Sequence, residues 1–326
     1  MTPLKFEELY QAEWQELEDL LDRVLGRKKK AASAEPLRGE RIATLYRRAC
    51  EQLALARARS YPAYLVDRLD RLTADAHQVI YQQREFGAGA LWRIFARDFP
   101  RAVRADAVFV SIAAALFVIP TIVLGVVVYY RPDLILSVVD AATAAQFEQM
   151  YSTVAESIGR TRDAGDDWTM FGFYIRNNVG VAFQCFASGL AAGIGSIFYL
   201  VYNGAMGGAV AGYLTERGLG ETFYSFVVTH GSFELTAIVL SGAAGLKLGH
   251  SLLAPGRRTR GQSLVVAAKD CVVIVYGVAA MLVVAAALEA FWSSSAWVPH
   301  GVKYGVAAVC WLAVFAYLAL QGRDAA

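Results

Sequence analysis

Hydrophobic residues recur at helical spacing over the first 86 residues and then merge into long apolar runs. Because apolar side chains repeat every three or four positions between charged ones, amphipathic helices are predicted over about 5–25, 38–60 and 64–86. Tyr61-Pro62 separates the second helix from the third, since proline interrupts a helix. The three can bury their apolar faces against one another as a small antiparallel bundle. Residues 1–86 are therefore expected to form a cytoplasmic helical region.

An aromatic and basic segment follows at residues 87–106. Trp92, Phe95 and Phe99 alternate there with four arginines. A bulky apolar face opposite a basic one is typical of a helix in the headgroup layer of a membrane. We interpret the segment as an interfacial helix; the alternative is an ordinary packed helix of the soluble bundle.

Residues 107–326 contain apolar runs long enough to cross roughly 30 Å of hydrocarbon as helices. The expected fold class is all-α, a polytopic transmembrane helix bundle with about six crossings, five being the alternative. The expected spans are about 107–130, 179–198, 200–215, 222–246, 263–290 and 301–320. The third is short and rich in glycine, so a pair of broken or re-entrant helices is its alternative.

Charge sets the expected orientation of these spans. The arginines before residue 107 and the basic stretch 247–262 favour the cytoplasmic side, because basic loops stay inside. Residues 131–178 carry four basic and seven acidic side chains and are expected as an extracytoplasmic loop. The start of the chain has no apolar signal-peptide core. We therefore expect a multi-pass protein of the bacterial inner (plasma) membrane with its amino terminus in the cytoplasm.

Composition narrows the classes of function. The chain is 56% hydrophobic and 18% charged, against roughly 25% charged residues in soluble domains. The net charge of +2 says little about nucleic acid, but the lack of a basic, aromatic stripe argues against a nucleic-acid partner. The four cysteines form no CxxC pair, and the sequence has no P-loop, HExxH or GxSxG motif. We expect a non-enzyme without a cofactor, an intramembrane hydrolase being the alternative.

Glycines repeat every four residues in several apolar runs. They are Gly189 and Gly193; Gly204, Gly208 and Gly212; Gly245 and Gly249; and Gly301 and Gly305. Glycine at this spacing lets helix backbones approach closely in lipid. We expect the glycines to pack helices within one protomer or between the protomers of a homodimer. The alternative is narrow cavities beside broken helices, as in transporters.

His230 and Glu234 are the main candidates for a functional site. They are four residues apart, so they share one helix face. Ionisable side chains at membrane depth are costly and usually face protein or water. We interpret them as a mutually satisfied structural pair, with a proton or ion relay and a metal-assisted hydrolase as alternatives. One histidine and one glutamate are too few ligands for zinc, so no metal is expected.

Other polar residues in the apolar runs are also candidates. Asn177, Asn178 and Asn203 are expected to cap helix ends or bridge helices, because buried amides need partners. Asp270 is expected to reach a partner inside the bundle, either His230 or Asn203.

The sequence resembles the stage II sporulation protein M family in several segments taken in order. These are residues 45–50, 67–72, 95–104, 175–180, 202–208 and the Thr229-His-Gly-Ser-Phe-Glu-Leu stretch. The resemblance implies an integral membrane scaffold that recruits envelope or cytoplasmic partners. It implies peptidoglycan-degrading enzymes or MoxR-type ATPases as those partners. A small-solute or ion transporter that uses the glycine-rich helices and the His230/Glu234 pair is the alternative.

Overall fold

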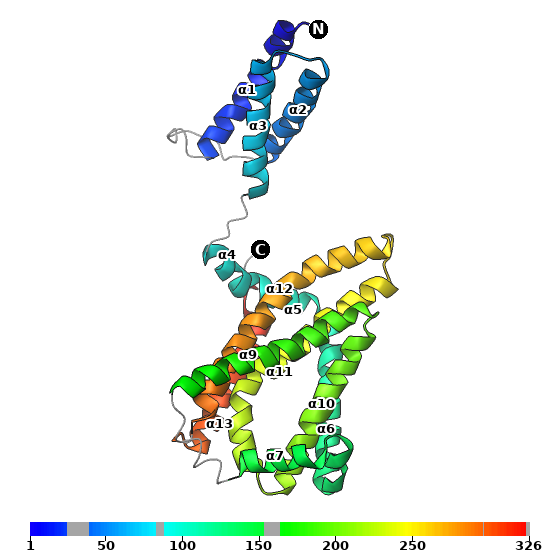
Figure 1. Cartoon of the computed structure of the whole chain (residues 1–326), viewed down its shortest axis with the longest axis vertical. Helices are drawn as coiled ribbons and strands as arrows, with labels where there is room; N and C mark the ends of the chain where they lie inside the picture. The colour runs from blue at the N-terminus through cyan, green and yellow to red at the C-terminus, as the bar shows by residue number, and fades with distance from the viewer. Residues whose placement is uncertain (25–38, 83–87, 153–163, 296, 324–326) are drawn as a thin grey trace. The chain divides into compact units, whose positions relative to one another are not determined.

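The computed structural model describes residues 1–24, 39–82, 88–152, 164–295 and 297–323. Within these ranges the chain forms helices joined by turns, and no strand. Contacts divide it into two compact units, Met1–Ala90 and Leu91–Ala326, and each is described by itself (Figure 1). The all-α prediction is confirmed.

The amino-terminal unit is a three-helix bundle with a core of its own. Its helices are α1 (Pro3–Val24), α2 (Gly39–Ala58) and α3 (Ala63–Gln82), close to the expected ranges. Phe6, Trp14 and Leu69 are buried among aliphatic side chains from the other helices. The indole Nε1 of Trp14 donates to Gln52 Oε1 over 2.6 Å, so the polar edge of the ring is satisfied inside this core.

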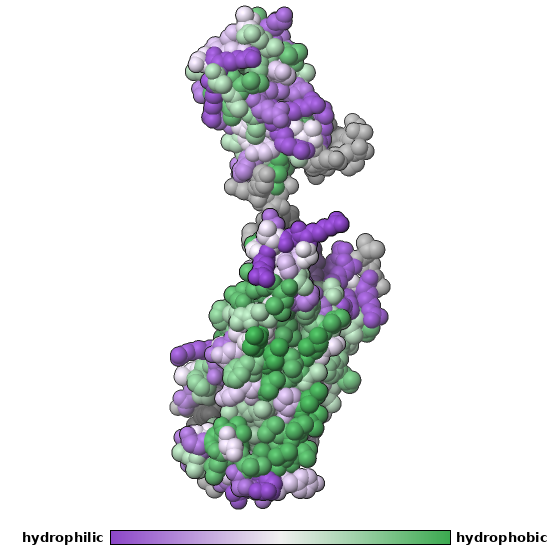
Figure 2. Space-filling model, turned by 90° about the vertical axis from the view of Figure 1, so that its right-hand side faces the viewer, coloured by the Kyte–Doolittle hydropathy of each residue, from purple (hydrophilic) through white to green (hydrophobic). Residues whose placement is uncertain are grey.

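The carboxy-terminal unit contains the apolar helices. In chain order it comprises α4 (Ala88–Arg93), η1 (Ile94–Asp98), α5 (Phe99–Ala105), α6 (Ala107–Tyr130), η2 (Pro132–Ser137), α7 (Ala141–Tyr151), α9 (Ala164–Ala187), η3 (Ser188–Leu190), α10 (Ile194–Glu216), α11 (Gly220–Leu253), α12 (Arg260–Ala287), η4 (Leu288–Ser293) and α13 (His300–Leu320). Among the described residues, five helices are long and apolar enough to cross a membrane: α6, α10, α11, α12 with η4, and α13. Figure 2 shows apolar side chains in a broad band on this unit, with polar side chains at both of its ends. The unit is therefore a polytopic transmembrane bundle, as predicted.

Contacts between α6 and α10 fix the direction of the chain. Gly204 lies against Phe117, Gly208 against Thr121, and Gly212 against Gly125; the numbers rise together, so the two helices run parallel. We call the side where α6 begins the near side and the side where it ends the far side. Because α6 and α10 both run from near to far, the chain must return to the near side between them.

Helix α9 makes this return. The Trp168 ring, close to its start, lies 5.2 Å from the ring of Phe291 in η4, at the far end of α12. Beyond its end, Gly189 lies against Gly245 on α11, toward the near side. Its 24 residues extend about 36 Å, enough to cross the hydrocarbon layer.

The last helix ends on the near side. Arg104, just before α6, donates to the carbonyl oxygens of Leu318 and Gln321 over 2.7 and 2.8 Å. Arg101 donates to the carbonyl of Gly322 over 2.6 Å. The transmembrane segment therefore starts and ends on one side, which requires an even number of passages: the five apolar helices and α9.

The second span is where the prediction was wrong. Residues 179–198 do not form one helix, because α9 ends at Ala187 and α10 begins at Ile194. Between them Ala192 and Gly193 have positive φ angles of 53° and 86°, which break the helix. Residues 164–178, expected in the outer loop, are instead the first part of α9. The third predicted span is continuous in α10, without the break considered for it.

The aromatic and basic segment is not a single interfacial helix. It divides into α4, the π-helical η1 and α5. Trp92 is exposed, whereas Phe99 is fully buried and packs against Gly277 of α12 and Tyr317 of α13. The arginines of α5 satisfy carbonyl groups at the end of α13, a common role for basic side chains at a helix carboxyl end.

Candidate functional site

The predicted glycine pairs lie at the closest contacts between helices. A Cβ atom added at Gly204, Gly208 or Gly212 would overlap a backbone carbonyl oxygen of α6. Gly189 approaches α11 in the same way at Gly245, and a Cβ atom added at Gly249 of α11 would overlap the backbone of Gly193. Each α-carbon therefore occupies space that no side chain can share. Gly301 and Gly305 differ, because nothing lies within 4 Å of their Cβ positions, so among the described residues these two do not hold helices together.

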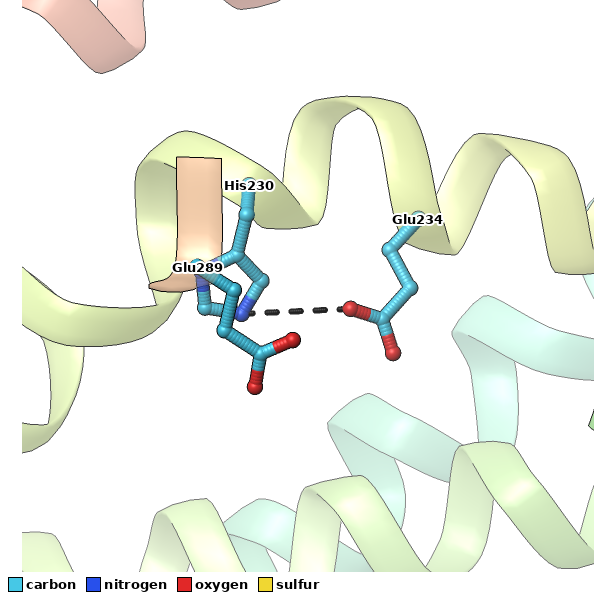
Figure 3. Close-up of side chains that lie close together, drawn as sticks. All are labelled: His230, Glu234 and Glu289. Carbon is cyan, nitrogen blue, oxygen red and sulfur yellow. Dashed lines mark ion pairs between the residues drawn. The ribbon is translucent and has the colours of Figure 1, made fainter. Parts of the chain in front are cut away.

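A cluster of three ionisable side chains lies between α11 and η4. His230 and Glu234 project from neighbouring turns of α11, and Glu289 projects from η4 into the same space (Figure 3). One donor atom from each residue can be chosen so that all three lie within 4.8 Å of one another. His230 lies ten residues after the far end of α11, about 15 Å along the helix. The cluster is therefore inside the membrane unit, toward the far side.

The contact between His230 and Glu234 is not a hydrogen bond. Nε2 of His230 lies 3.9 Å from Glu234 Oε2, beyond the usual limit for an N–H···O bond. The side chain of His230 is 5% exposed and that of Glu234 is 19% exposed. The two residues share a face as the sequence predicted, but they do not satisfy each other directly.

The other ring nitrogen of His230 is held by η4. Nδ1 lies 3.0 Å from Ser293 Oγ, and the carbonyl of Ser293 accepts a 2.8 Å bond from the buried Lys303 Nζ at the start of α13. Thr229 Oγ1 makes a longer contact of 3.4 Å with the Lys303 carbonyl. Three helical elements thus fix the orientation of the imidazole.

Asn178 joins the cluster from α9. It is 3% exposed, and its amide interacts electrostatically with the Glu289 carboxylate. No hydrogen bond of ordinary geometry joins them, and within the described residues both Asn178 Nδ2 and Glu289 Oε2 are buried without a partner. Asn177 is exposed and donates from Nδ2 to Asn178 Oδ1 over 3.1 Å. The site therefore has unmet hydrogen-bonding capacity.

Two predicted residues lie elsewhere. Asn203 donates to the carbonyl of Tyr199 in its own helix, and so bridges no helices. Asp270 contacts neither His230 nor Asn203, so that prediction was wrong. It lies 3.7 Å from Lys247 Nζ, which also pairs with Asp106 at 2.8 Å. These three residues form a separate ionic cluster near the start of α6.

Sequence reasoning missed Glu289, Ser293 and Lys303. Glu289 follows 18 uncharged residues, 271–288, and is the only acidic residue between Asp270 and Asp324. That isolation was a usable signal. The structure also places it in a π-helix, a wider turn that often occurs at functional sites and that apolar periodicity does not predict.

Comparison with known proteins identifies two regions of the chain. The family model described as stage II sporulation protein M matches residues 113–294. A domain of unknown function, DUF8413, matches residues 4–82, which coincides with the three-helix unit. Neither the curated proteins nor the solved structures contain a match to this chain.

Proposed function

Because the family model covers more than half of its residues, the chain belongs to the stage II sporulation protein M family, and we propose that it is a membrane scaffold that recruits partner proteins. In this proposal the membrane unit is the anchor and the amino-terminal unit presents the binding surface. The proposal includes a location in the bacterial inner membrane, an amino-terminal unit in the cytoplasm, and a homodimer as the assembled form.

The observation that carries the proposal is the backbone packing of α10 on α6. Three successive turns of α10 present glycine to carbonyl groups of α6. Helices that touch at their backbones leave no path for a solute between them and resist movement relative to each other. A scaffold benefits from such rigidity, whereas a transporter must rock one helical group against another.

The amino-terminal unit has the features of a protein-binding module. Its core is filled by its own three helices, so it does not depend on the membrane unit for burial of apolar groups. Its surface nevertheless leaves Leu4 and Leu9 of α1 and Tyr64 of α3 exposed. In this proposal these exposed side chains form part of the surface that contacts the partner. A MoxR-type ATPase is the cytoplasmic partner that the family resemblance favours.

The test is recovery of that ATPase with the tagged, full-length protein from native membranes. We expect an ATPase of this type among the enriched proteins. Leu9→Glu should reduce its recovery at least fivefold, because Leu9 is 58% exposed, without lowering the amount of protein. Leu55→Glu is the matched control, an exposed leucine on α2. Equal recovery with Leu9→Glu and the wild type, or enrichment of no ATPase or envelope enzyme, would contradict the proposal.

A small-ion transporter is the second candidate function. It is favoured by the buried His230 and the partly buried Glu234 and Glu289, because ionisable groups at membrane depth often line ion pathways. In proteoliposomes, this function requires proton or cation flux that Glu234→Gln abolishes. Flux equal to that of protein-free vesicles would exclude it and leave the scaffold proposal unaffected.

A further inference from the structure

We propose that His230, Glu234 and Glu289 bind a divalent transition-metal cation inside the membrane unit. Their donor atoms can all lie within 4.8 Å of one another (Figure 3). Two ligands that share an ion at about 2.0–2.2 Å are separated by roughly 3–4 Å. Small rotations of the two glutamate side chains therefore suffice to bring the three donors onto one ion.

The hydrogen bonds of the imidazole leave Nε2 as the free ligand atom. Nδ1 lies 3.0 Å from Ser293 Oγ, a hydroxyl that can accept a hydrogen bond. In the tautomer in which Nδ1 donates to this hydroxyl, Nε2 has a lone pair. That lone pair faces Glu234 at 3.9 Å, and two electron-rich groups do not attract each other. A cation between them resolves the contact, and the bond from Nδ1 is the outer contact that metal-binding histidines usually make.

The charges in the cluster also favour a cation. Glu234 and Glu289 contribute two carboxylates to a region with little exposure to water, where unpaired charge is expensive. Lys303 Nζ also lies close by and donates to the Ser293 carbonyl. Tyr151 of α7, whose ring lies 6.1 Å from Phe226, also interacts electrostatically with Glu289. A phenol supplies a hydrogen bond but no positive charge, so a divalent ion balances the two carboxylates.

Unpartnered atoms from two other elements point to the same place. Glu289 Oε2 and Asn178 Nδ2 are buried and lack hydrogen-bond partners among the described residues. Asn178 is 3% exposed and comes from α9, a different element from those that carry the three ligands. Buried polar atoms are rarely left unpaired in stable proteins. A bound ion would be coordinated by Glu289 Oε2, and a water molecule on that ion would accept a hydrogen bond from Asn178 Nδ2.

The donor set indicates which cations fit. One imidazole and two carboxylates suit Zn²⁺, Mn²⁺ or Fe²⁺, whereas Mg²⁺ and Ca²⁺ prefer oxygen ligands alone. Three protein ligands leave at least one position open to water, as in catalytic zinc sites. The sequence indicated only two ligands because Glu289 is distant in the chain, so its argument against zinc counted one donor too few.

The experiment measures zinc bound to purified full-length protein in detergent. After chelation and reloading with Zn²⁺, we expect about one equivalent per chain by elemental analysis. Glu289→Gln and His230→Ala should each lose that equivalent, and Ser293→Ala should weaken zinc binding about 10- to 100-fold. His300→Ala is the matched control. His300 Nδ1 pairs with Glu221 at 3.0 Å in a more exposed position, and this variant should retain the ion.

A second measurement distinguishes loss of the metal site from loss of folding. Co²⁺ in place of Zn²⁺ should give the visible absorption of a nitrogen- and oxygen-ligated ion in the wild type and in His300→Ala. That absorption should be missing from Glu289→Gln protein that still elutes as a single folded species. The proposal would be overturned if Glu289→Gln and His230→Ala retained zinc. It would also be overturned if the wild-type protein bound zinc more weakly than His300→Ala does. Wild-type protein that binds less than a tenth of an equivalent would overturn it as well.

Discussion

Gly208→Ala tests the contact between α10 and α6 with a single methyl group. Gly208 is buried at the middle of the seam, with Gly204 one turn before it and Gly212 one turn after. The added Cβ would overlap the backbone of Thr121. A backbone carbonyl cannot rotate away as a flexible side chain can, so the two helices must separate.

The expected cost follows from the size of that separation. A carbon and a carbonyl oxygen pack at about 3.3–3.6 Å, so α10 must move by on the order of 1 Å from α6. Overpacking of this kind typically costs about 1–3 kcal/mol. Alanine also has a higher helix propensity than glycine, by about 1 kcal/mol, which opposes the loss. The control must therefore be another glycine-to-alanine substitution, which gains the same helix propensity.

Gly207→Ala supplies this control from the next position of the same helix. Gly207 is exposed and has no atom within 4 Å of its Cβ position. The difference between the unfolding free energies of the two variants cancels the gain in helix propensity and leaves the steric cost. We expect Gly208→Ala to be less stable than Gly207→Ala by about 1–3 kcal/mol, which is a roughly 5- to 150-fold shift in the unfolding equilibrium.

The assay is unfolding of the purified protein in mixed micelles with increasing SDS, followed by tryptophan fluorescence and circular dichroism. Gly208→Ala should unfold at a lower SDS fraction than Gly207→Ala. Identical unfolding curves would mean that the two backbones do not touch at Thr121. The packing of α10 on α6 would then not make the membrane unit a rigid anchor.

Two further predictions concern the near side of the membrane unit. Lys247→Met should destabilise the unit by about 1–3 kcal/mol in the same SDS assay, because it leaves the largely buried carboxylate of Asp106 unpaired. Adding Asp106→Asn to this variant should recover part of the lost stability. If the stability losses of the two substitutions simply added, the pairing of Lys247 with Asp106 would be contradicted. Reporters fused to the two ends of the chain should lie on one side of the membrane, and a reporter inserted at Gly218 should lie on the other; end reporters on opposite sides would mean an odd number of passages.

The amino-terminal helices were predictable because their signals are local. The repeat of apolar positions and the Tyr61-Pro62 break both act over a few residues, and the observed helices begin and end close to the expected positions. The five apolar helices were predictable for a similar reason, since uncharged runs of this length are typical of membrane spans.

The second passage was placed incorrectly because hydropathy alone did not define it. Asp166, Asp167 and Arg176 lie in α9 and made its first half resemble a loop. Its end is set by the left-handed backbone at Ala192 and Gly193. The parallel direction of α6 and α10 shows instead that α9 crosses, and only contacts between distant residues reveal that direction.

The cluster was half predictable. A spacing of four residues places His230 and Glu234 on one face of any helix, so that pair needed no tertiary information. Glu289 is 55 positions beyond Glu234 and reaches it only because α12 packs antiparallel to α11 and changes to a π-helix at its end. Neither the packing direction nor the wider turn is encoded in a local apolar pattern.

Helix α11 connects a second set of close backbone contacts to the polar cluster. Its near-side half, around Gly245 and Gly249, touches the turn between α9 and α10 at backbone distance, while its far-side half carries His230 and Glu234. A site that uses three separate donors requires their positions to be held within about 0.5 Å. Such precision is hard to achieve with flexible side-chain packing, but backbone contact leaves α11 little freedom to slide or rotate. The glycines and the cluster are therefore parts of one arrangement, in which close packing at one end of a 34-residue helix fixes the geometry of ionisable groups at the other.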